Sequence, residues 1–201
     1  MKKIKIDACV CRLKLFDHHK IKDEVLSDID RSFSESLSPT NSFIDSVSRL
    51  DWSQSKDFER SWTKIFLPSF HITMKEFLAG SGYKDEKNVQ LNDVWYQQYL
   101  EGDSHGWHVH SDHFTGVYYL EYPRGCSKTE ICSPYSLKTK KIDASEGDIV
   151  LFPSHWIHRG PPNKSENRKT IVSFNFSLDL NYKFNTDLIT SRNVGKPYIL
   201  F

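Results

Sequence analysis

The sequence has 201 residues with 27 basic and 26 acidic side chains, a net charge of +1, which predicts one domain and does not indicate a nucleic-acid partner. It contains no run of 18 apolar residues, which argues against a transmembrane helix. The basic start, Met1–Ile6, lacks the apolar stretch of a secretion signal, so we expect a cytoplasmic protein without a membrane partner.

The first part of the chain, residues 1–87, predicts a strand followed by helices that buttress a sheet. Residues 3–16 alternate apolar with polar side chains, which is typical of a strand. Residues 20–37 predict a helix, because apolar side chains recur every four positions. These side chains are Ile21, Val25, Ile29, Phe33 and Leu37.

A serine-rich connection and a second helical region follow. Nine serines fall between residues 32 and 55, which indicates a loop, and we expect Trp52 within it to plug the core rather than line a pocket. Residues 57–79 repeat apolar side chains at helical spacing, but Pro68 interrupts them. Because proline removes a helical hydrogen bond, we expect two helices that meet near Pro68.

Residues 88–178 change to strand character, with short apolar segments between turns rich in glycine and proline. Together with the preceding helices, they predict a mainly β fold, a double-stranded β-helix or jelly roll. The basic segment 138–141 is expected to be a solvated face, and the tail 179–201 either wraps the barrel or contacts a partner. The expected strands lie at 94–99, 114–122, 129–133, 149–152 and 168–178.

The four cysteines are Cys9, Cys11, Cys126 and Cys132. We expect them to be reduced, because cytoplasmic proteins rarely keep disulfides. Cys9 and Cys11 form a close pair, but no second pair follows at zinc-finger spacing. A structural role for the thiols is therefore favoured.

The stretch Trp107–Leu120 carries the most informative polar side chains. In an extended chain, side chains two apart share a face, so His108, His110 and Asp112 are expected to point the same way. A pair of imidazoles at this spacing is half of a metal site, and His158 is the expected distant ligand. Six of the nine histidines fall between residues 105 and 158, which supports a metal site here.

Two ligand sets are compatible with these residues. One is all-histidine, with His108, His110 and His158. The other replaces His108 with Asp112, which gives the two-histidine, one-carboxylate face of many non-haem iron enzymes. The residue pattern alone favours the second set.

Several motifs resemble the iron(II)/2-oxoglutarate oxygenases, in particular a branch frequent in phage and bacterial genomes. The resemblance covers roughly residues 90–178 and places Arg168 ten positions after His158. Within this branch the Trp-His-x-His motif implies the all-histidine ligand set, which we adopt. The motifs are Trp107-His108-Val109-His110, Gly116-Val117-Tyr118-Tyr119-Leu120, Leu151-Phe152-Pro153 and Ser173-Phe174-Asn175.

The resemblance implies an enzyme that uses iron(II), 2-oxoglutarate and O2, with ascorbate as a supporting reductant. Such an enzyme hydroxylates an unactivated C–H bond and releases succinate and CO2. Arg168 would bind the far carboxylate of 2-oxoglutarate bidentately, and Thr170 would donate a hydroxyl hydrogen bond to it. Gln97 or Tyr99 would contact the cosubstrate from a neighbouring strand.

Two other functions remain open at this point. A cupin-type dioxygenase would use three histidines without 2-oxoglutarate and would not need Arg168. A jelly roll that only binds a metal or ligand would show no turnover. For the oxygenase, the substrate is a small molecule, an amino acid or a peptide, because the fold does not select among them.

Overall fold

The computed structural model describes residues 9–40, 45–80, 89–133, 136–178 and 198–199. Most of the expected first strand, residues 3–8, and most of the tail lie outside this part of the chain. The predicted catalytic region, residues 88–178, lies almost entirely within it.

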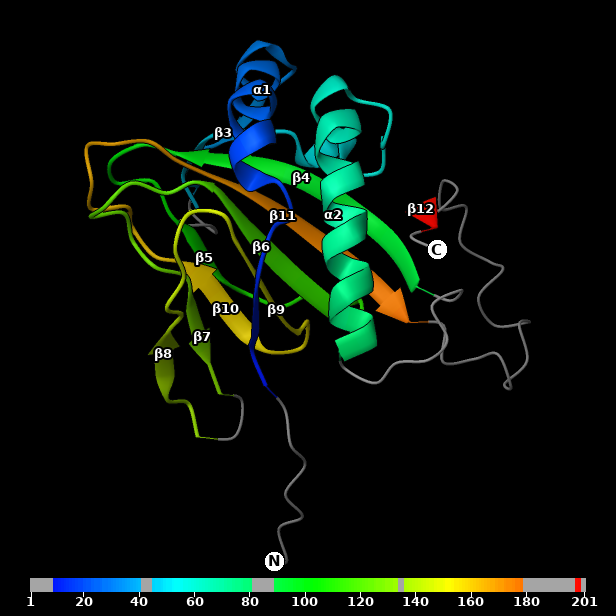
Figure 1. The fold of residues 1–201 in the computed structure, drawn as a ribbon. Coiled ribbons are helices and arrows are strands. Elements are labelled where there is room, and N and C mark those ends of the chain that lie inside the picture. Colours follow the sequence, from blue (N-terminus) through cyan, green and yellow to red (C-terminus); the bar gives the residue numbers. More distant parts are fainter. Residues whose placement is uncertain (1–8, 41–44, 81–88, 134–135, 179–197, 200–201) are drawn as a thin grey trace, which may run out of the picture.

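Two antiparallel sheets form the core, as expected for a jelly roll (Figure 1). The smaller sheet has the order β5 (His105–His108), β10 (Ile157–Gly160), β7 (Glu130–Cys132), β8 (Thr139–Lys141). The larger sheet has the order β1 (Cys11–Lys14), β9 (Asp148–Pro153), β6 (Phe114–Glu121), β11 (Lys169–Leu178), β4 (Val89–Tyr99), β3 (Val47–Leu50), β2 (Glu35–Leu37), with β12 (Tyr198–Ile199) beside β4.

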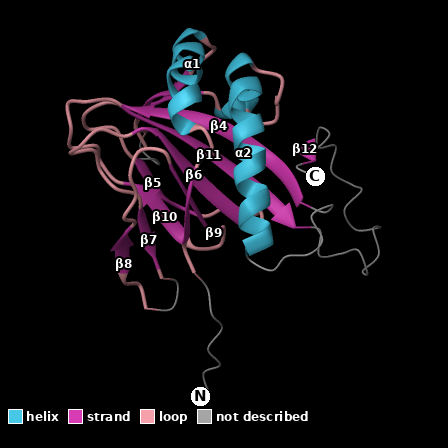
Figure 2. Cartoon of the chain, in the orientation of Figure 1, coloured by secondary structure: helices cyan, strands magenta, loops and turns pink. Residues whose placement is uncertain are grey.

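Two helices cover the outer face of the larger sheet, α1 (His18–Arg31) and α2 (Ser61–Gly80) (Figures 1 and 2). Aromatic side chains of α2 pack on this face: the Phe66 ring lies 5.4 Å from Tyr118 and the Phe70 ring 4.6 Å from Phe174. All four side chains are fully buried. The helices therefore buttress the sheet and leave its other face to the site.

Gly116 on β6 lies at a tightly packed point of the outer face. A Cβ atom at this position would collide with the rings and methyl groups of Phe174 and Leu151. The glycine therefore lets β6 and its neighbours on both sides pack against α2 without a bulge.

The first helix is shorter than expected, and the prediction for residues 32–37 is wrong. The helix ends at Arg31, and the backbone N–H of Ser32 donates to the carbonyl of Ile29. Residues 35–37 form strand β2, and Phe33 is 52% exposed. Serines compete for backbone hydrogen bonds and disfavour helix interiors, and this outweighs the apolar spacing.

The expected break at Pro68 is also wrong, because α2 runs without interruption through it. Proline leaves the carbonyl four residues earlier, that of Lys64, without its helical partner. Both Pro68 and Lys64 lie on the exposed side of the helix. Water can therefore satisfy this carbonyl, while the buried side of the helix keeps its packing.

The connection between β3 and α2 is tied to the sheet through Asp51, which is fully buried. Its carboxylate accepts hydrogen bonds from the backbone N–H of Tyr96 at 2.8 Å and the indole N–H of Trp62 at 3.0 Å. It also pairs with the guanidinium of Arg60. Asp51 thus fixes the short helix η1 (Trp52–Gln54) beside β4.

All four cysteines are free thiols, and strand β8 with its two lysines is exposed, as predicted. Among the described residues, no helix is long and apolar enough to cross a membrane.

Candidate metal centre and cofactor pocket

Three histidines meet between the two sheets. His108 ends β5 and lies directly opposite His158 of the neighbouring strand β10. His110 lies on the loop that follows. The backbone N–H of His110 donates to the carbonyl of Ser154 at 3.0 Å and so fixes this loop. One ring nitrogen of each histidine lies within 4.8 Å of the other two. The structure therefore brings together the all-histidine set expected from the sequence.

The hydrogen bonds of two of these imidazoles fix which nitrogen faces the centre. Nδ1 of His108 lies 2.7 Å from the carbonyl of Gly106, and Nδ1 of His158 lies 2.9 Å from that of Trp156. A carbonyl only accepts, so Nδ1 carries the proton in both rings and Nε2 presents its lone pair. This is the tautomer that a metal-ligating histidine needs.

Burial keeps the three imidazoles neutral. Burial, together with the neighbouring histidines, lowers the pKa of His158 to about 3. Burial likewise lowers the pKa of His110 to about 3 and shifts that of His108 downward. Neutral imidazole is the form that binds metal, so the donor set suits a divalent transition metal such as iron(II).

Asp112 does not join this cluster. Its Oδ1 atom accepts hydrogen bonds from Nδ2 of Asn92 at 2.5 Å and from Oγ of Ser177 at 3.4 Å. The regular alternation that would place it beside His110 ends with β5, since residues 109–113 form a loop. Of the two ligand sets that the sequence left open, the structure therefore groups the three histidines and leaves Asp112 apart from them.

A small pocket of about 30 Å³ lies beside the histidines, between the sheets. Its walls come from the inner faces of β4, β6 and β11, and from the smaller sheet. Gln97 and Tyr99 line it, as expected from the sequence. The other side chains at this pocket are Trp95, His105, Thr115, Val117, Thr129, Arg159, Lys169, Ile171 and Ser173.

Lys169 supplies a buried cation to this pocket, a role that the sequence analysis missed. The side chain is 1% exposed, its Nζ atom lies 4.2 Å from the Tyr99 ring centroid, and it donates to the carbonyl of Ser127 at 3.3 Å. No carboxylate pairs with it among the residues that the structure describes. Burial lowers the pKa of Lys169 to about 8.

Arg168 and Thr170 lie on the opposite face of β11, so the prediction that they face the pocket is corrected. Arg168 donates to Glu121 through Nε at 2.7 Å and to Asp30 of α1 through Nη1 at 2.8 Å. The Thr170 hydroxyl also donates to Glu121, at 2.7 Å. Arg168 thus links the sheet to α1, whereas Thr170 bonds to the neighbouring strand β6.

The pairing of β11 with β4 explains why Lys169, and neither of its neighbours, faces the pocket. Alternation puts Lys169 and Ile171 on one face of β11 and Arg168 and Thr170 on the other. Lys169 pairs directly with Tyr99 across the ladder, and Ile171 pairs with Gln97. Gln97 and Tyr99 line the pocket, so this register places Lys169 there rather than Arg168 or Thr170.

His105 is a further site residue, which the sequence analysis counted among the clustered histidines without a role of its own. Its ring stacks on His108 with centroids 4.1 Å apart, and its Nδ1 atom lies 3.2 Å from Nε2 of Gln97. Gln97 in turn accepts a hydrogen bond from the Ser173 hydroxyl at 3.1 Å. This chain of contacts holds His108 and Gln97 in place.

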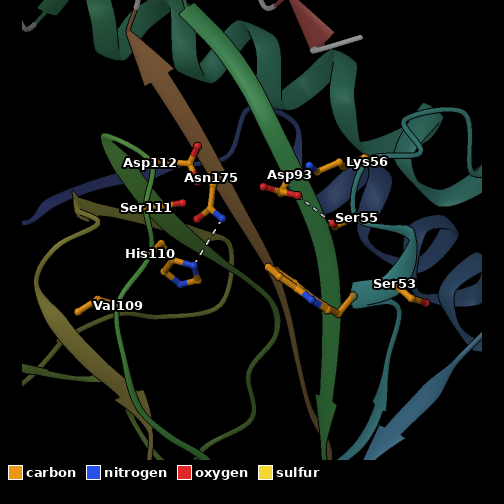
Figure 3. A pocket seen from close by; sticks show the side chains of 10 residues that line it. Ser53, Ser55, Lys56, Asp93, Val109, His110, Ser111, Asp112 and Asn175 are labelled. Atoms are coloured by element: carbon orange, nitrogen blue, oxygen red, sulfur yellow. Dashed lines mark hydrogen bonds between the residues drawn. The ribbon is translucent and has the colours of Figure 1, made fainter. Parts of the chain in front are cut away.

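An open cleft of about 710 Å³ leads from the surface to His110, which lines both cavities. Figure 3 shows Ser53, Ser55 and Lys56 on one side and the loop 109–112 on the other, with Asp93 and Asn175 between them. Asp93 accepts a hydrogen bond from Ser55 at 2.8 Å.

Trp52 forms part of the wall of this cleft, so the expectation that it plugs the core is wrong. It is 45% exposed and packs edge-on against Trp95, with ring centroids 4.4 Å apart. The buried Asp51 beside it ties this segment to the sheet, so the indole is free to face the cleft.

No protein-family model and no curated protein matches the sequence. Solved structures with the same fold include a 2OG-Fe(II) oxygenase family member from Burkholderia pseudomallei, with a TM-score of 0.65, 10% identity and 84% of each chain covered. A prolyl-4-hydroxylase from Pseudomonas putida has a TM-score of 0.61 and 10% identity, covering 85% of this chain and 93% of that one.

A third similar structure is a prolyl hydroxylase from Trichoplax adhaerens in complex with a peptide fragment of hypoxia inducible factor. It has a TM-score of 0.56 and 15% identity, and it covers 84% of this chain and 83% of that one. The chain therefore has the double-stranded β-helix fold of the iron(II)/2-oxoglutarate oxygenases. The resemblance expected from the sequence motifs is confirmed at the level of the fold.

Proposed function

We propose that this chain is an iron(II)- and 2-oxoglutarate-dependent dioxygenase. One observation carries the proposal: three neutral imidazoles converge within 4.8 Å beside a pocket that holds a buried lysine without a carboxylate partner among the described residues. A metal face and an anion-binding cation in one closed pocket are what a chelating dicarboxylate needs. When bound, iron(II) and 2-oxoglutarate supply O2 activation for the oxidation of a C–H bond, with release of succinate and CO2.

In this proposal His108, His110 and His158 hold iron(II) as a facial triad, which leaves positions for cosubstrate and O2. The triad contributes no anion, so its net charge is one unit more positive than that of a two-histidine, one-carboxylate site. A dianionic cosubstrate would offset this charge. Iron(II) and 2-oxoglutarate binding are therefore expected to favour each other.

Lys169 is the proposed partner of the far carboxylate of 2-oxoglutarate. Arg159 also lines the pocket, but its guanidinium already pairs with Glu130, through Nε at 2.8 Å and Nη2 at 2.7 Å. Within the described part of the chain, the ammonium of Lys169 contacts the Ser127 carbonyl and the Tyr99 ring and pairs with no carboxylate. A buried cation of this kind gains most from an incoming carboxylate.

The pocket has to widen for this cosubstrate, because about 30 Å³ is far less than a ten-atom dicarboxylate occupies. We expect the Lys169 side chain, which lies over the Tyr99 ring, to move and open this space. Gln97 and Tyr99 stay in contact with the vacated space and offer an amide and a hydroxyl to the bound carboxylate.

The open cleft is the proposed substrate site, because it ends at His110. Its walls combine an aromatic side chain, hydroxyls and charges of both signs, which suits an amino acid, a peptide or another polar small molecule. The structures with this fold include prolyl hydroxylases, and one of these holds a peptide. Hydroxylation of a C–H bond in such a substrate is the proposed reaction.

Anaerobic calorimetry tests the cosubstrate assignment. We expect 2-oxoglutarate to bind the iron(II)-loaded protein, and Lys169→Met to weaken binding about 10–100-fold, since a charge-assisted hydrogen bond contributes roughly 1.5–3 kcal/mol. Arg168→Met is the matched control, because the adjacent side chain faces α1, and its affinity should stay within about threefold. Equal losses in both variants would contradict the role of Lys169.

Succinate formation with iron(II), ascorbate and O2 then tests turnover, with His158→Ala as the inactive reference. The all-histidine triad also favours one other candidate, a cupin-type dioxygenase without 2-oxoglutarate. That candidate predicts tight iron binding and no calorimetric response to 2-oxoglutarate in the wild-type protein. Such a result would replace the present proposal.

A further inference from the structure

Asn175 on β11 lies where the cleft meets His110 (Figure 3). It is 2% exposed, and its Nδ2 atom lies 3.5 Å from Nδ1 of His110. Its Oδ1 atom is the only buried side-chain nitrogen or oxygen without a hydrogen-bond partner within the described residues. Such an atom is costly in a protein interior and calls for a physical reason.

His110 differs from the other two histidines in how its ring is held. Nδ1 of His108 and Nδ1 of His158 each donate to the carbonyl two residues earlier in the chain. For His110 the contact of Nδ1 is instead the side chain of Asn175. Its tautomer therefore depends on one amide group rather than on the backbone.

The two orientations of this amide select opposite tautomers. If Nδ2 of Asn175 donates to Nδ1 of His110, the imidazole carries its proton on Nε2 and cannot ligate through that atom. If the amide is turned by 180°, Oδ1 accepts from Nδ1–H, and Nε2 presents a lone pair. Each orientation leaves one atom of the Asn175 amide without a hydrogen-bond partner, either Oδ1 or Nδ2. Turning the amide therefore does not increase the number of unsatisfied polar atoms.

We propose that Asn175 is a positioning residue that holds His110 in the Nδ1–H tautomer through Oδ1, so that all three Nε2 lone pairs converge. The inference rests on the proposed metal site. Under this proposal, substitution of Asn175 alone removes the contact that keeps His110 in its metal-binding tautomer. Outer partners of this kind orient imidazole ligands and typically change metal affinity by about 10–100-fold when they are lost.

The test combines ring-nitrogen NMR of His110 in the metal-free protein with a cobalt(II) titration. We expect wild type to show Nδ1–H at His110, and Asn175→Leu, which keeps a similar volume, to lose this preference and bind cobalt(II) about 10–100-fold more weakly. Asn175→Asp keeps an acceptor oxygen at the same place and should restore Nδ1–H and most of the affinity.

Ser177→Ala is the matched control, because Ser177 lies two residues along the same strand and contacts Asp112 rather than His110. It should change neither the tautomer nor the cobalt(II) affinity. Nε2–H at His110 in the wild-type protein would overturn the inference, and so would cobalt(II) affinity in Asn175→Leu within about twofold of wild type.

The positioning role of Asn175 and the metal site can be contradicted independently. If wild-type His110 shows Nδ1–H but the protein binds no cobalt(II), the positioning role stands and the metal site falls. If Asn175→Leu does not fold, which thermal unfolding will show, the wild-type tautomer and the Asn175→Asp variant still decide the question.

Discussion

At the scale of single residues, His108 and Asp112 distinguish the two possible ligand sets. His108 lies within the cluster of ring nitrogens, whereas Asp112 is bound to Asn92 and Ser177. We expect His108→Ala to lower iron(II) affinity by more than about 100-fold, beyond the loss of an outer partner. Asp112→Ala should leave it within about threefold in the same anaerobic titration. If Asp112→Ala instead lowers iron(II) affinity more than His108→Ala does, the ligand set that contains Asp112 is supported.

The lowered pKa of Lys169 predicts how 2-oxoglutarate affinity depends on pH. Below pH 8 the free side chain is an ammonium and binds the carboxylate. Above about 8, its pKa in the free protein, binding must first take up a proton, so the dissociation constant should rise about tenfold per pH unit. The three histidines stay neutral over this range and add no dependence, since burial lowers the pKa of each of them.

Lys169→Arg is the control for this pH profile, because a guanidinium keeps its charge at every pH of the experiment. Its affinity for 2-oxoglutarate should be flat between pH 7 and pH 9. A wild-type profile that is equally flat would show that Lys169 does not bind the cosubstrate as an ammonium.

At the scale of elements, the segment η1 and the residues directly after it, Ser55 and Lys56, shape one wall of the cleft. Asp51 and Arg60 hold it through a buried pair whose side chains are 0% and 7% exposed. Removing one partner of such a pair leaves an uncompensated charge, so Asp51→Asn should lower the free energy of unfolding by about 3–5 kcal/mol.

Denaturant unfolding measures this loss. Asp143→Asn is the matched control, because its carboxylate pairs with Lys128 on the surface and is 84% exposed, and it should leave the midpoint unchanged. If the two variants unfold alike, the buried pair does not stabilise the wall of the cleft.

At the scale of the whole molecule, the site lies between two sheets and depends on both. His108 and His158 come from the smaller sheet, and Lys169 comes from the larger one. A ligand that binds across them stabilises only the folded state, by about 2.7 kcal/mol at a concentration of 100 times its dissociation constant. Cobalt(II) should therefore raise the melting temperature, and 2-oxoglutarate should raise it further.

Differential scanning fluorimetry can follow both shifts. In His158→Ala the cobalt(II) shift should disappear, and the 2-oxoglutarate shift should shrink, because the metal no longer anchors the cosubstrate. Unchanged shifts in His158→Ala would mean that these ligands bind elsewhere on the molecule.

The sequence by itself determined the features that depend on local periodicity. Alternating apolar segments indicated the jelly-roll strands, and the close spacing of His108 and His110 indicated a metal-binding site at the end of a strand. The helix before residue 32 and the buried stripe of α2 follow from the same argument. These predictions succeed because side-chain direction within one element depends only on its own repeat.

Only the tertiary structure decided which side of an element is functional. Alternation separates Arg168 from Lys169, but it does not say which of them faces the gap between the sheets. The helices settle this by covering the face of Arg168, whose guanidinium pairs with Asp30 of α1. Lys169 is left on the inner face, where burial lowers its pKa.

The same limit explains Asp112 and Trp52. The loop after β5 bends away from strand geometry and carries Asp112 to Asn92. Trp52 faces the cleft because the buried Asp51 fixes the segment around it. Long-range contacts make these choices, and no local pattern in one sequence records them.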